Sequence, residues 1–178
     1  MHAPVLTTER LKMRAVRADD FDDCLALWSD PLVTRYITGR ASTGDETWGR
    51  LQRYAGMWSL IGYGYWIVED AASGQYIGEV GFGDHRRVME PSIVGIPEIG
   101  WVLGSAFFGR GYATEAVSAA LAWSDANLAD PQVVCIINAA NADSIRVAEK
   151  CGFGDSHLTT FRGDSTLLFR RRARALSA

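Results

Sequence analysis

The segment FFGRGYATEA, at residues 107–116, places Gly109 and Gly111 between strand-like aromatic residues and a run of good helix formers. The following helix carries its small and apolar residues on one face, at Ala113, Ala116, Val117, Ala120 and Leu121. The first turn of a helix leaves about four backbone N–H groups without intrahelical partners, and the helix dipole adds about half a positive charge there. The segment therefore predicts an anion-binding strand–loop–helix junction, although glycines before a helix also serve simple tight turns.

Other phosphate-binding motifs fit this chain less well. The string GxxxxGK followed by Ser or Thr, which defines a P-loop, is absent. A dinucleotide fingerprint needs GxGxxG, but GRGYAT places Thr114 at the third glycine position, and GYGYWI and GFGDHR fail at the same place. No cluster of acidic residues or histidines indicates a required metal. These absences favour a ligand whose phosphates are bound but not broken.

Helical and strand-like patterns alternate along the chain. A helix beginning after Asp19 or Asp20 and ending at Pro31 is expected to bury Phe21, Cys24, Leu25 and Trp28. A second helix, from Asp45 to about Gly62, is expected to bury Trp48, Leu51, Tyr54, Ala55 and Trp58. A third, capped by Asn141 and ended by Gly152, carries Ile145, Ala148 and Cys151. The expected strands are Arg10–Val16, Tyr65–Glu69, Gln75–Phe82, Glu98–Leu103, Val133–Ile137, Ser156–Phe161 and Ser165–Arg171.

This order of elements predicts an α+β fold with a mixed, mostly antiparallel central sheet flanked by helices. The 178 residues contain no repeat, low-complexity tract or long linker, so we expect one domain over residues 1–178. The formal net charge of −3 argues against nucleic-acid binding. We interpret the run Arg170, Arg171, Arg172 and Arg174 as a solvated tail rather than a nucleic-acid or membrane contact.

The cysteines and the hydropathy of the chain bear on disulfides, metal sites and cellular location. Three cysteines, Cys24, Cys135 and Cys151, form no CxxC pair, so a disulfide framework or zinc site is not expected. Cys135 and Cys151 fall on apolar faces, which favours core packing over covalent catalysis. No segment has the length and hydropathy of a signal peptide or membrane span, so we expect a cytoplasmic protein. The sequence leaves open whether it forms a homodimer.

Four segments together resemble the GCN5-related N-acetyltransferase (GNAT) superfamily, in particular the branch of ribosomal-protein N-terminal acetyltransferases (the RimJ/RimL type). They are TERLKMRAVRADD, IGEVGF, PEIGWVLGSAFFGRGYATEA and NAANADSIRVAEKCGF, and they span about residues 7–153. The resemblance implies a sheet splayed open between Glu98–Leu103 and Val133–Ile137, with acetyl-coenzyme A in the opening and no metal. In place of the superfamily's usual Gln or Arg, this chain has Phe108 at the start of the phosphate loop.

By the same resemblance, backbone amides of the loop hold the pyrophosphate of the cofactor, the strand before the loop pairs with the pantetheine arm, and Asn141 binds that arm from the other side. The expected cofactor-binding residues are Trp101, Val102, Leu103, Phe108, Gly109, Arg110, Gly111, Tyr112, Ala113, Thr114 and Asn141.

Attack of an amine on a thioester needs a neutral amine, a polarised carbonyl and a protonated leaving thiolate. The resemblance implies Glu98 as general base, on a strand face shared with Gly100 and Val102; the alternative is a solvated strand-edge carboxylate. Backbone N–H groups near Trp101 or Val102 would polarise the carbonyl. Many members of the superfamily protonate the thiolate with a tyrosine in a region where this chain has none, so Ser144 is the candidate here. Its alternative role is helix capping, because it follows Asn141 by three residues.

Two further polar residues precede the Glu98 strand. His85 either lines the entrance for the acceptor or lies in a solvated loop. Glu79 either faces the acceptor cleft or forms the polar side of a hairpin.

The acceptor is constrained only weakly. A protein α-amine has a reference pKa of about 7.7 to 8.0 and lysine one of about 10.4, so an α-amine or small amine needs less help to become neutral. Specificity is expected from residues 31–44 and 160–165. Two readings from other classes stay open: an acyl-coenzyme A sensor without catalysis, and a regulatory domain that binds ATP or NAD.

Overall fold

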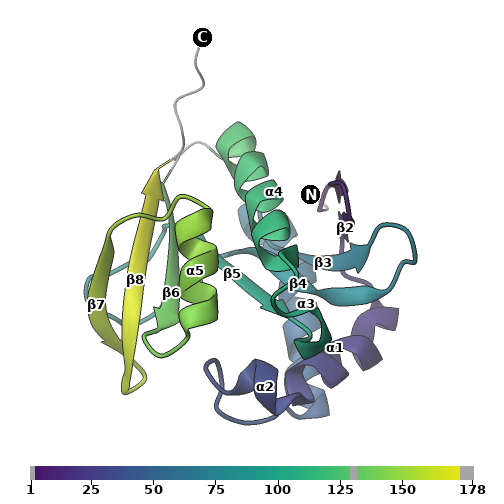
Figure 1. The fold of residues 1–178 in the computed structure, drawn as a ribbon, viewed down its shortest axis with the longest axis horizontal. Coiled ribbons are helices and arrows are strands. Elements are labelled where there is room, and N and C mark those ends of the chain that lie inside the picture. The colour runs from purple at the N-terminus through teal and green to yellow at the C-terminus, as the bar shows by residue number, and fades with distance from the viewer. Residues whose placement is uncertain (1–2, 129–131, 173–178) are drawn as a thin grey trace.

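The computed structural model describes residues 3–128 and 132–172, and its centre is one eight-stranded sheet in the order β1-β2-β3-β4-β5-β6-β8-β7 (Figure 1). All neighbouring strands pair antiparallel except β5 and β6, which are parallel. The strands are β1 (Leu6–Thr7), β2 (Leu11–Arg14), β3 (Tyr65–Asp70), β4 (Tyr76–Gly83), β5 (Glu98–Leu103), β6 (Gln132–Asn138), β7 (Ser156–Phe161) and β8 (Asp164–Arg172).

Helices cover both faces of this sheet, which confirms the α+β class and the mixed sheet. Figure 1 shows α4 in front of the sheet and α3 behind it, and α5 lies against β6 beside α4. The helices are α1 (Phe21–Ser29), α2 (Pro31–Thr34), α3 (Gly44–Ile61), α4 (Tyr112–Asn127) and α5 (Ala142–Lys150), with short 3₁₀ turns η1 (Ala18–Asp20) and η2 (Ser105–Phe107). No helix of the described residues is long and apolar enough to cross a membrane.

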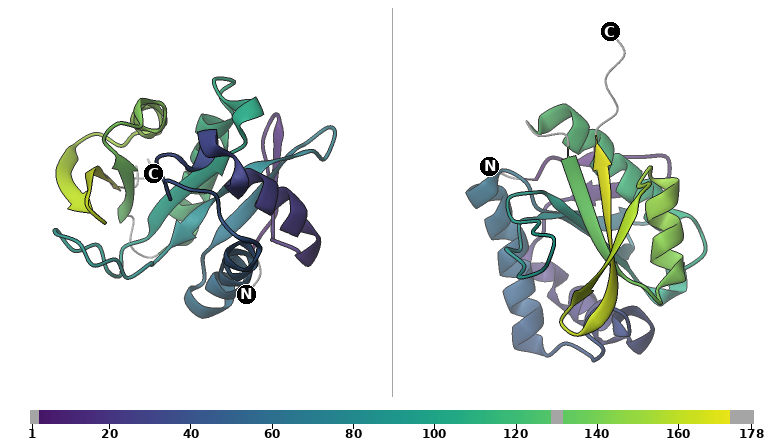
Figure 2. Two further views of the ribbon diagram at one scale, coloured as in Figure 1. Left: turned by 90° about the horizontal axis from the view of Figure 1, so that it is seen from below. Right: turned by 90° about the vertical axis from the view of Figure 1, so that its left-hand side faces the viewer.

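The sheet divides between β5 and β6. These two strands share a single residue pair, Glu98 with Val134, and then diverge, as the resemblance predicted. Figure 1 shows β6, β8 and β7 as a separate group beside α5. The segment 84–97 runs from β4 toward this group, where Ile93 packs on Val134 and Leu168 (Figure 2, left). The loop therefore connects the two halves at the end where they still touch.

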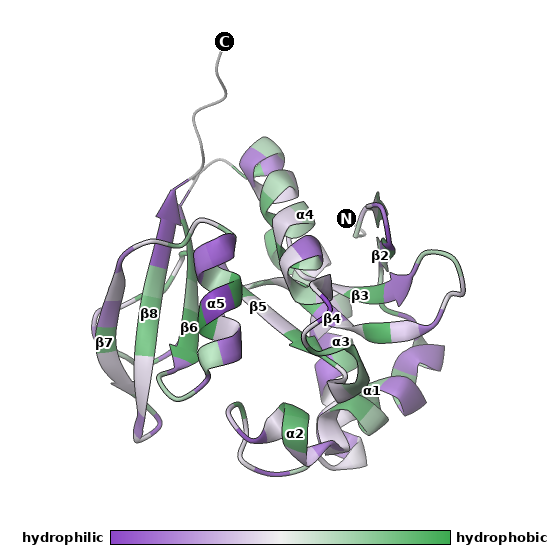
Figure 3. Cartoon of the chain, viewed as in Figure 1, coloured by the Kyte–Doolittle hydropathy of each residue, from purple (hydrophilic) through white to green (hydrophobic). Residues whose placement is uncertain are grey.

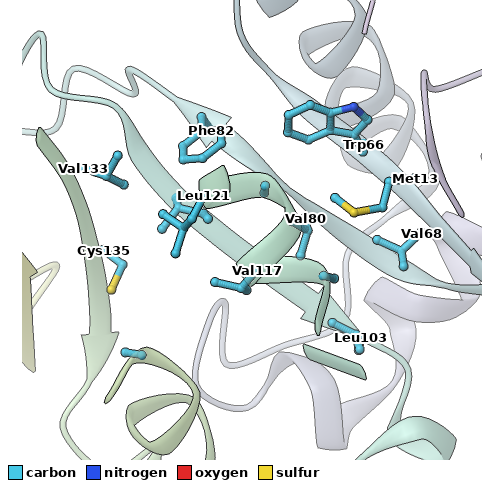
Figure 4. Packing of buried hydrophobic residues seen from close by; sticks show 14 of the residues in the cluster. Met13, Trp66, Val68, Val80, Phe82, Leu103, Val117, Leu121, Val133 and Cys135 are labelled. Carbon is cyan, nitrogen blue, oxygen red and sulfur yellow. The ribbon is translucent and has the colours of Figure 1, made fainter. Parts of the chain in front are cut away.

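The main core lies between β2–β6 and α4. Val80 and Phe82 of β4 face Val117 and Leu121 of α4 in Figure 4, and all four are buried. In the second half of the sheet, β6 and the middle of β8 are apolar along the segments that pair (Figure 3). Packing of these apolar faces fixes the position of α4 against β5, and so the position of the loop that precedes it.

Several local expectations were wrong. Asp20 occupies the N-cap position of α1 as predicted, but its side chain does not bond to the helix; its carboxylate instead accepts hydrogen bonds from Arg14 and from the Arg17 amide, ahead of the helix. Leu51, Tyr54 and Trp58 of α3 are buried as predicted, but Trp48 is 43% exposed and Ala55 is exposed, and Thr47 completes the buried stripe instead. Pro31 does end α1, and it also begins α2 as its first residue.

The C-terminal arginines are also not a simple solvated tail. Arg170, Arg171 and Arg172 belong to β8, and both terminal nitrogens of Arg171 bind the Asp125 carboxylate at 2.7 and 2.8 Å. Arg174 lies outside the described residues. The ion pair between Arg171 and Asp125 of α4 therefore anchors part of this basic run to the fold.

Candidate functional site

The loop before α4 has the backbone geometry of an anion site. Gly109 and Gly111 have φ of +72° and +81°, in the left-handed region where residues other than glycine are strained. Gly111 is the N-cap, and the first intrahelical bond runs from the Glu115 amide to the Gly111 carbonyl at 3.1 Å. The amides of residues 112–114 precede that bond and so have no partner within the helix. They gather at the positive end of a 16-residue helix.

Arg10 holds this loop in place from β2. Its Nε donates to Glu115 at 2.7 Å, and one terminal nitrogen donates to the Arg110 carbonyl at 3.0 Å. The guanidinium also lies 4.5 Å from the centre of the Tyr112 ring. The Arg110 side chain turns to the rings of Phe107 and Tyr112. These contacts fix the first turn of α4 without using the amides that it presents.

A cavity of about 600 Å³, here called the loop cavity, opens on this junction. Ten of the eleven residues predicted to bind cofactor line it, and Arg110 does not. Three basic residues that the sequence reasoning missed, Arg35, Arg146 and Lys150, also line it. Their signal was weak, because lone basic residues on α5 and after α2 look like ordinary surface positions.

The edge of β5 completes the loop cavity. Residues 101–103 pair with β4 on one side, but on the other side β5 is paired with β6 only at Glu98. The main-chain groups of Trp101 and Leu103 face β6 and are thus left for a ligand, whereas those of Val102 face β4. An extended chain with amide groups could pair with them as another strand would.

A second cavity of about 900 Å³, here called the arginine cavity, lies on the α3 side of β5. It is lined by five arginines, Arg50, Arg53, Arg86, Arg87 and Arg162, with Glu98, Asp164, His85 and aromatic residues including Trp28, Tyr54 and Tyr65.

Glu98 lines this cavity but is already paired. It is 5% exposed, and both its oxygens accept hydrogen bonds from Arg87, at 2.6 and 2.8 Å. The structure therefore excludes the alternative of a solvated strand-edge carboxylate. Both oxygens of Glu98 thus already have a donor, which an incoming amine would have to share.

His85 is half-buried and lines the same cavity, so it is not part of a solvated loop. Burial lowers its pKa below the ordinary 6.5, against the opposing attraction of Glu98. The imidazole is therefore mostly neutral at neutral pH and able to accept a proton.

Tyr65 stacks on Tyr54 with ring centres 4.3 Å apart, and its hydroxyl lies over Gly100, where a Cβ would be 2.4 Å away. Burial raises the pKa of both tyrosines, so they stay protonated.

Glu79 is neither in the cleft nor on the polar side of a hairpin. It is fully buried beneath α1 and α3 and does not line either cavity. Four side chains donate to its carboxylate: Cys24 at 2.9 Å, Trp28 at 3.0 Å, Tyr54 at 2.7 Å and Tyr76 at 3.0 Å. The sequence could not show this, because the four donors come from three separate elements.

The two cavities meet in the gap between β5 and α5. Six residues line both: Tyr36, Ile37, Trp101, Val102, Asn141 and Ser144. The Asn141 side chain accepts the Ser144 amide at 3.1 Å, so Asn141 caps α5 as expected, and Ser144 is not the capping residue. Tyr36 was missed as an individual residue, although it falls within the segment expected to set specificity. This junction is where a group bound in one cavity could react with a group bound in the other.

Cys135 and Cys151 lie where packing within the fold, rather than covalent catalysis, is expected. Cys135 is buried, and burial raises the pKa of its thiol. Cys151 follows α5, where its Sγ lies 3.7 Å from the Thr114 carbonyl. Among the described residues no three His, Cys, Asp or Glu side chains are grouped to hold a metal ion.

Comparison with known proteins gives a consistent result. The family model described as acetyltransferase (GNAT) domain matches residues 10–154. A structure from Bordetella pertussis assigned to the GnaT acetyltransferase family is 34% identical, with a TM-score of 0.84 over 95% of this chain and 99% of that one. An acetyltransferase of Agrobacterium tumefaciens is 29% identical, with a TM-score of 0.81 over 97% and 96%.

A more distant match is RimL, the ribosomal L7/L12 alpha-N-protein acetyltransferase in complex with coenzyme A. It is 16% identical, with a TM-score of 0.76 over 95% of this chain and 98% of that one. At this identity the likeness concerns the fold and does not decide the branch.

The geometry of the loop predicts the effect of filling it. We expect Gly111→Trp to weaken coenzyme A binding at least tenfold, because a side chain strains this left-handed position and its Cβ would lie 3.4 Å from Arg10, which holds the loop. Isothermal titration of coenzyme A measures this. Gly74→Trp is the matched control, because Gly74 has a φ of +73°, has open space around it and lines neither cavity. Equal affinity of the two variants would contradict the assignment of the loop.

Proposed function

Because the chain belongs to the GNAT acetyltransferase family, we propose that it transfers an acetyl group from acetyl-coenzyme A to a primary amine within a ternary complex. The observation that carries this proposal is the meeting of the two cavities at Trp101, Val102, Asn141 and Ser144. One cavity has the features of a nucleotide-and-pantetheine site, and the other is separate and large enough for an acceptor. The proposed setting is the cytoplasm.

In this proposal the loop cavity holds the cofactor. Amides of residues 109–114 bind the pyrophosphate, and the free edge of Trp101–Leu103 pairs with the pantetheine arm, which Asn141 contacts from α5. Arg35, Arg146 and Lys150 supply positive charge for the remaining phosphate. Backbone donors need no particular side chain at Phe108, which agrees with the departure at this position.

Acetyl-coenzyme A supplies the acetyl group as an activated thioester. The Trp101 amide, on the unpaired side of β5, donates a hydrogen bond to the carbonyl oxygen, whereas the Val102 amide faces β4 and is not available for this role. At the junction, Ser144 and Tyr36 are the two hydroxyls available to protonate the leaving thiolate.

Two groups of the arginine cavity are candidates for taking the proton of the amine. Glu98 follows from the family resemblance, whereas His85 is supported by its neutral imidazole and by the two hydrogen bonds that Arg87 already makes to Glu98. We propose His85 as the acceptor of the proton, with Glu98 as the alternative.

For the acceptor, a protein N-terminal α-amine or a small-molecule amine fits better than lysine, because less work is needed to make it neutral. The RimL-like branch is one source of such acceptors, supported by the sequence segments and by the similar fold of RimL.

A turnover assay tests the proposal. Purified protein with acetyl-coenzyme A and a panel of primary amines is expected to release free thiol, detected with a thiol reagent, only when both substrates are present. Mass spectrometry of the product should show the amine heavier by one acetyl group. Binding of coenzyme A without turnover across the panel would favour the sensor. Stabilisation by ATP or NAD but not by coenzyme A, in a thermal shift assay, would favour the regulatory domain.

The pH dependence separates the two candidates for the base. If neutral His85 takes the proton, activity falls as pH drops through its pKa, which lies below 6.5. We expect His85→Gln to lower kcat about 100-fold or more and to abolish this acidic limb, with little change in cofactor affinity. Glu98→Gln is expected to lower kcat but to keep the limb. Loss of the limb in Glu98→Gln, with the limb intact in His85→Gln, would assign the base to Glu98.

A further inference from the structure

The arginine cavity is positively charged in a protein that is negatively charged overall. The whole chain has a formal net charge of −3. The residues that line the cavity include five arginines and only two carboxylates, Glu98 and Asp164, and they include no lysine. His85 adds no charge at neutral pH, because burial lowers its pKa. The surplus of positive charge is thus concentrated where the acceptor is proposed to bind.

Not every arginine in the cavity is free. Arg87 is neutralised by Glu98 at 2.6 Å. Arg86 is an exposed residue 3.6 Å from Asp84, and Arg162 is an exposed residue on the turn between β7 and β8. Asp164, on the same turn, is exposed as well and can offset Arg162. The charge that remains uncompensated comes from Arg50 and Arg53, which are one turn apart on α3.

Arg50 is held in position, yet no acidic side chain of the described residues forms an ion pair with it. Its guanidinium carbon lies 3.5 Å from the centre of the Trp28 ring, which orients the planar group. One terminal nitrogen is buried and has no hydrogen-bond partner within residues 3–128 and 132–172. A buried N–H donor without a partner is costly, so such a group is usually completed by something that binds to it.

The nearest buried anion does not fulfil this need. Glu79 lies behind Trp28 and Tyr54, and its two oxygens already accept four hydrogen bonds, two of them from these residues. No ion pair within 4 Å joins it to Arg50 in the described part of the chain. Glu79 therefore lowers the local potential but leaves the donors of Arg50 unfilled.

We propose that the acceptor is a small amine that also carries a carboxylate, and that Arg50, supported by Arg53, binds this carboxylate while the amine reaches the junction of the two cavities. This proposal rests on the proposed acetyltransferase function. A guanidinium binds a carboxylate through two parallel hydrogen bonds, and the ring of Trp28 leaves its donor edge available for them. The aromatic lining, with Tyr54 and Met57, suits an apolar body between the two charged ends of the acceptor.

The same charges disfavour a polyamine. A polyamine at neutral pH would bring several positive charges into a cavity that already has an excess of them, and like charges brought together in a partly buried site repel. The arginine cavity thus attracts the carboxylate of an amino acid and repels the additional positive charges of a polyamine.

Matched acceptors test the proposal. The panel contains phenylalanine, phenylalaninamide and phenethylamine, which share the ring and the primary amine but differ in the carboxylate, together with β- and γ-amino acids and spermidine. We expect kcat/KM for phenylalanine, or for one of the longer amino acids, to exceed that for phenylalaninamide and for spermidine at least tenfold. The amine of the carboxamide is the more readily neutral of the two, so inherent reactivity would give the opposite order.

Variants assign the preference to the two arginines. Arg50→Gln and Arg53→Gln are expected to raise KM for the preferred amino acid at least tenfold and to lower the ratio of its kcat/KM to that for phenethylamine at least tenfold. Arg53 is exposed, so its replacement does not disturb packing even if Arg50→Gln is unstable. Arg50→Lys keeps the charge but loses the paired hydrogen bonds, and is expected to be intermediate. Arg40→Gln is the control, because Arg40 is exposed near the start of the same helix and lines neither cavity.

Different results would overturn the carboxylate site and the acetyltransferase function. Equal turnover of phenylalanine, phenylalaninamide and spermidine, or unchanged discrimination in Arg50→Gln and Arg53→Gln, would overturn this inference and leave the acetyltransferase intact. Absence of thiol release with every amine would overturn the proposed function. In that case, calorimetry with N-acetylphenylalanine and its carboxamide still tests the site: tighter binding of the acid supports it, and equal binding overturns it.

Discussion

The divergence of two parallel strands is the constraint on which the rest of this molecule depends. After the pair of Glu98 with Val134, β5 and β6 separate, and the main-chain groups of Trp101 and Leu103 lose the neighbour that a closed sheet would give them. Unpaired backbone groups away from water are costly, so a ligand that pairs with them is favoured. The same divergence leaves room for the amides in the first turn of α4, which follow Gly111, to face the gap.

Polar groups around this gap are either saturated or left open, and the contrast indicates their roles. Glu79 is saturated by four donors and joins α1 and α3 to the sheet. Each oxygen of Glu98 accepts one hydrogen bond from Arg87, and this pair fixes the loop that precedes β5. Arg50 and the first amides of α4 are open, and they lie on the two cavities. The two carboxylates hold parts of the fold in place through bonds within the chain, whereas Arg50 and the α4 amides have donors that a ligand can fill.

The sequence was sufficient for the parts of the fold that depend on local patterns. It predicted β5 to the residue, the Asn141 cap and the left-handed Gly152, because strand alternation, side-chain capping and glycine each act over a few residues. It was not sufficient where contacts join distant segments. The pairing of Arg87 with Glu98, the donors around Glu79 and the approach of Tyr36 to α5 all depend on how the elements pack, and no spacing along the chain records them.

A crystal structure of the protein with coenzyme A tests the central claim most directly. We predict that the pyrophosphate lies at hydrogen-bonding distance, about 2.7–3.2 Å, from amides within residues 109–114. We also predict that the pantetheine arm pairs with Trp101–Leu103 between β5 and β6. A complex in which the gap between these strands is empty, or in which coenzyme A binds elsewhere on the molecule, would contradict it.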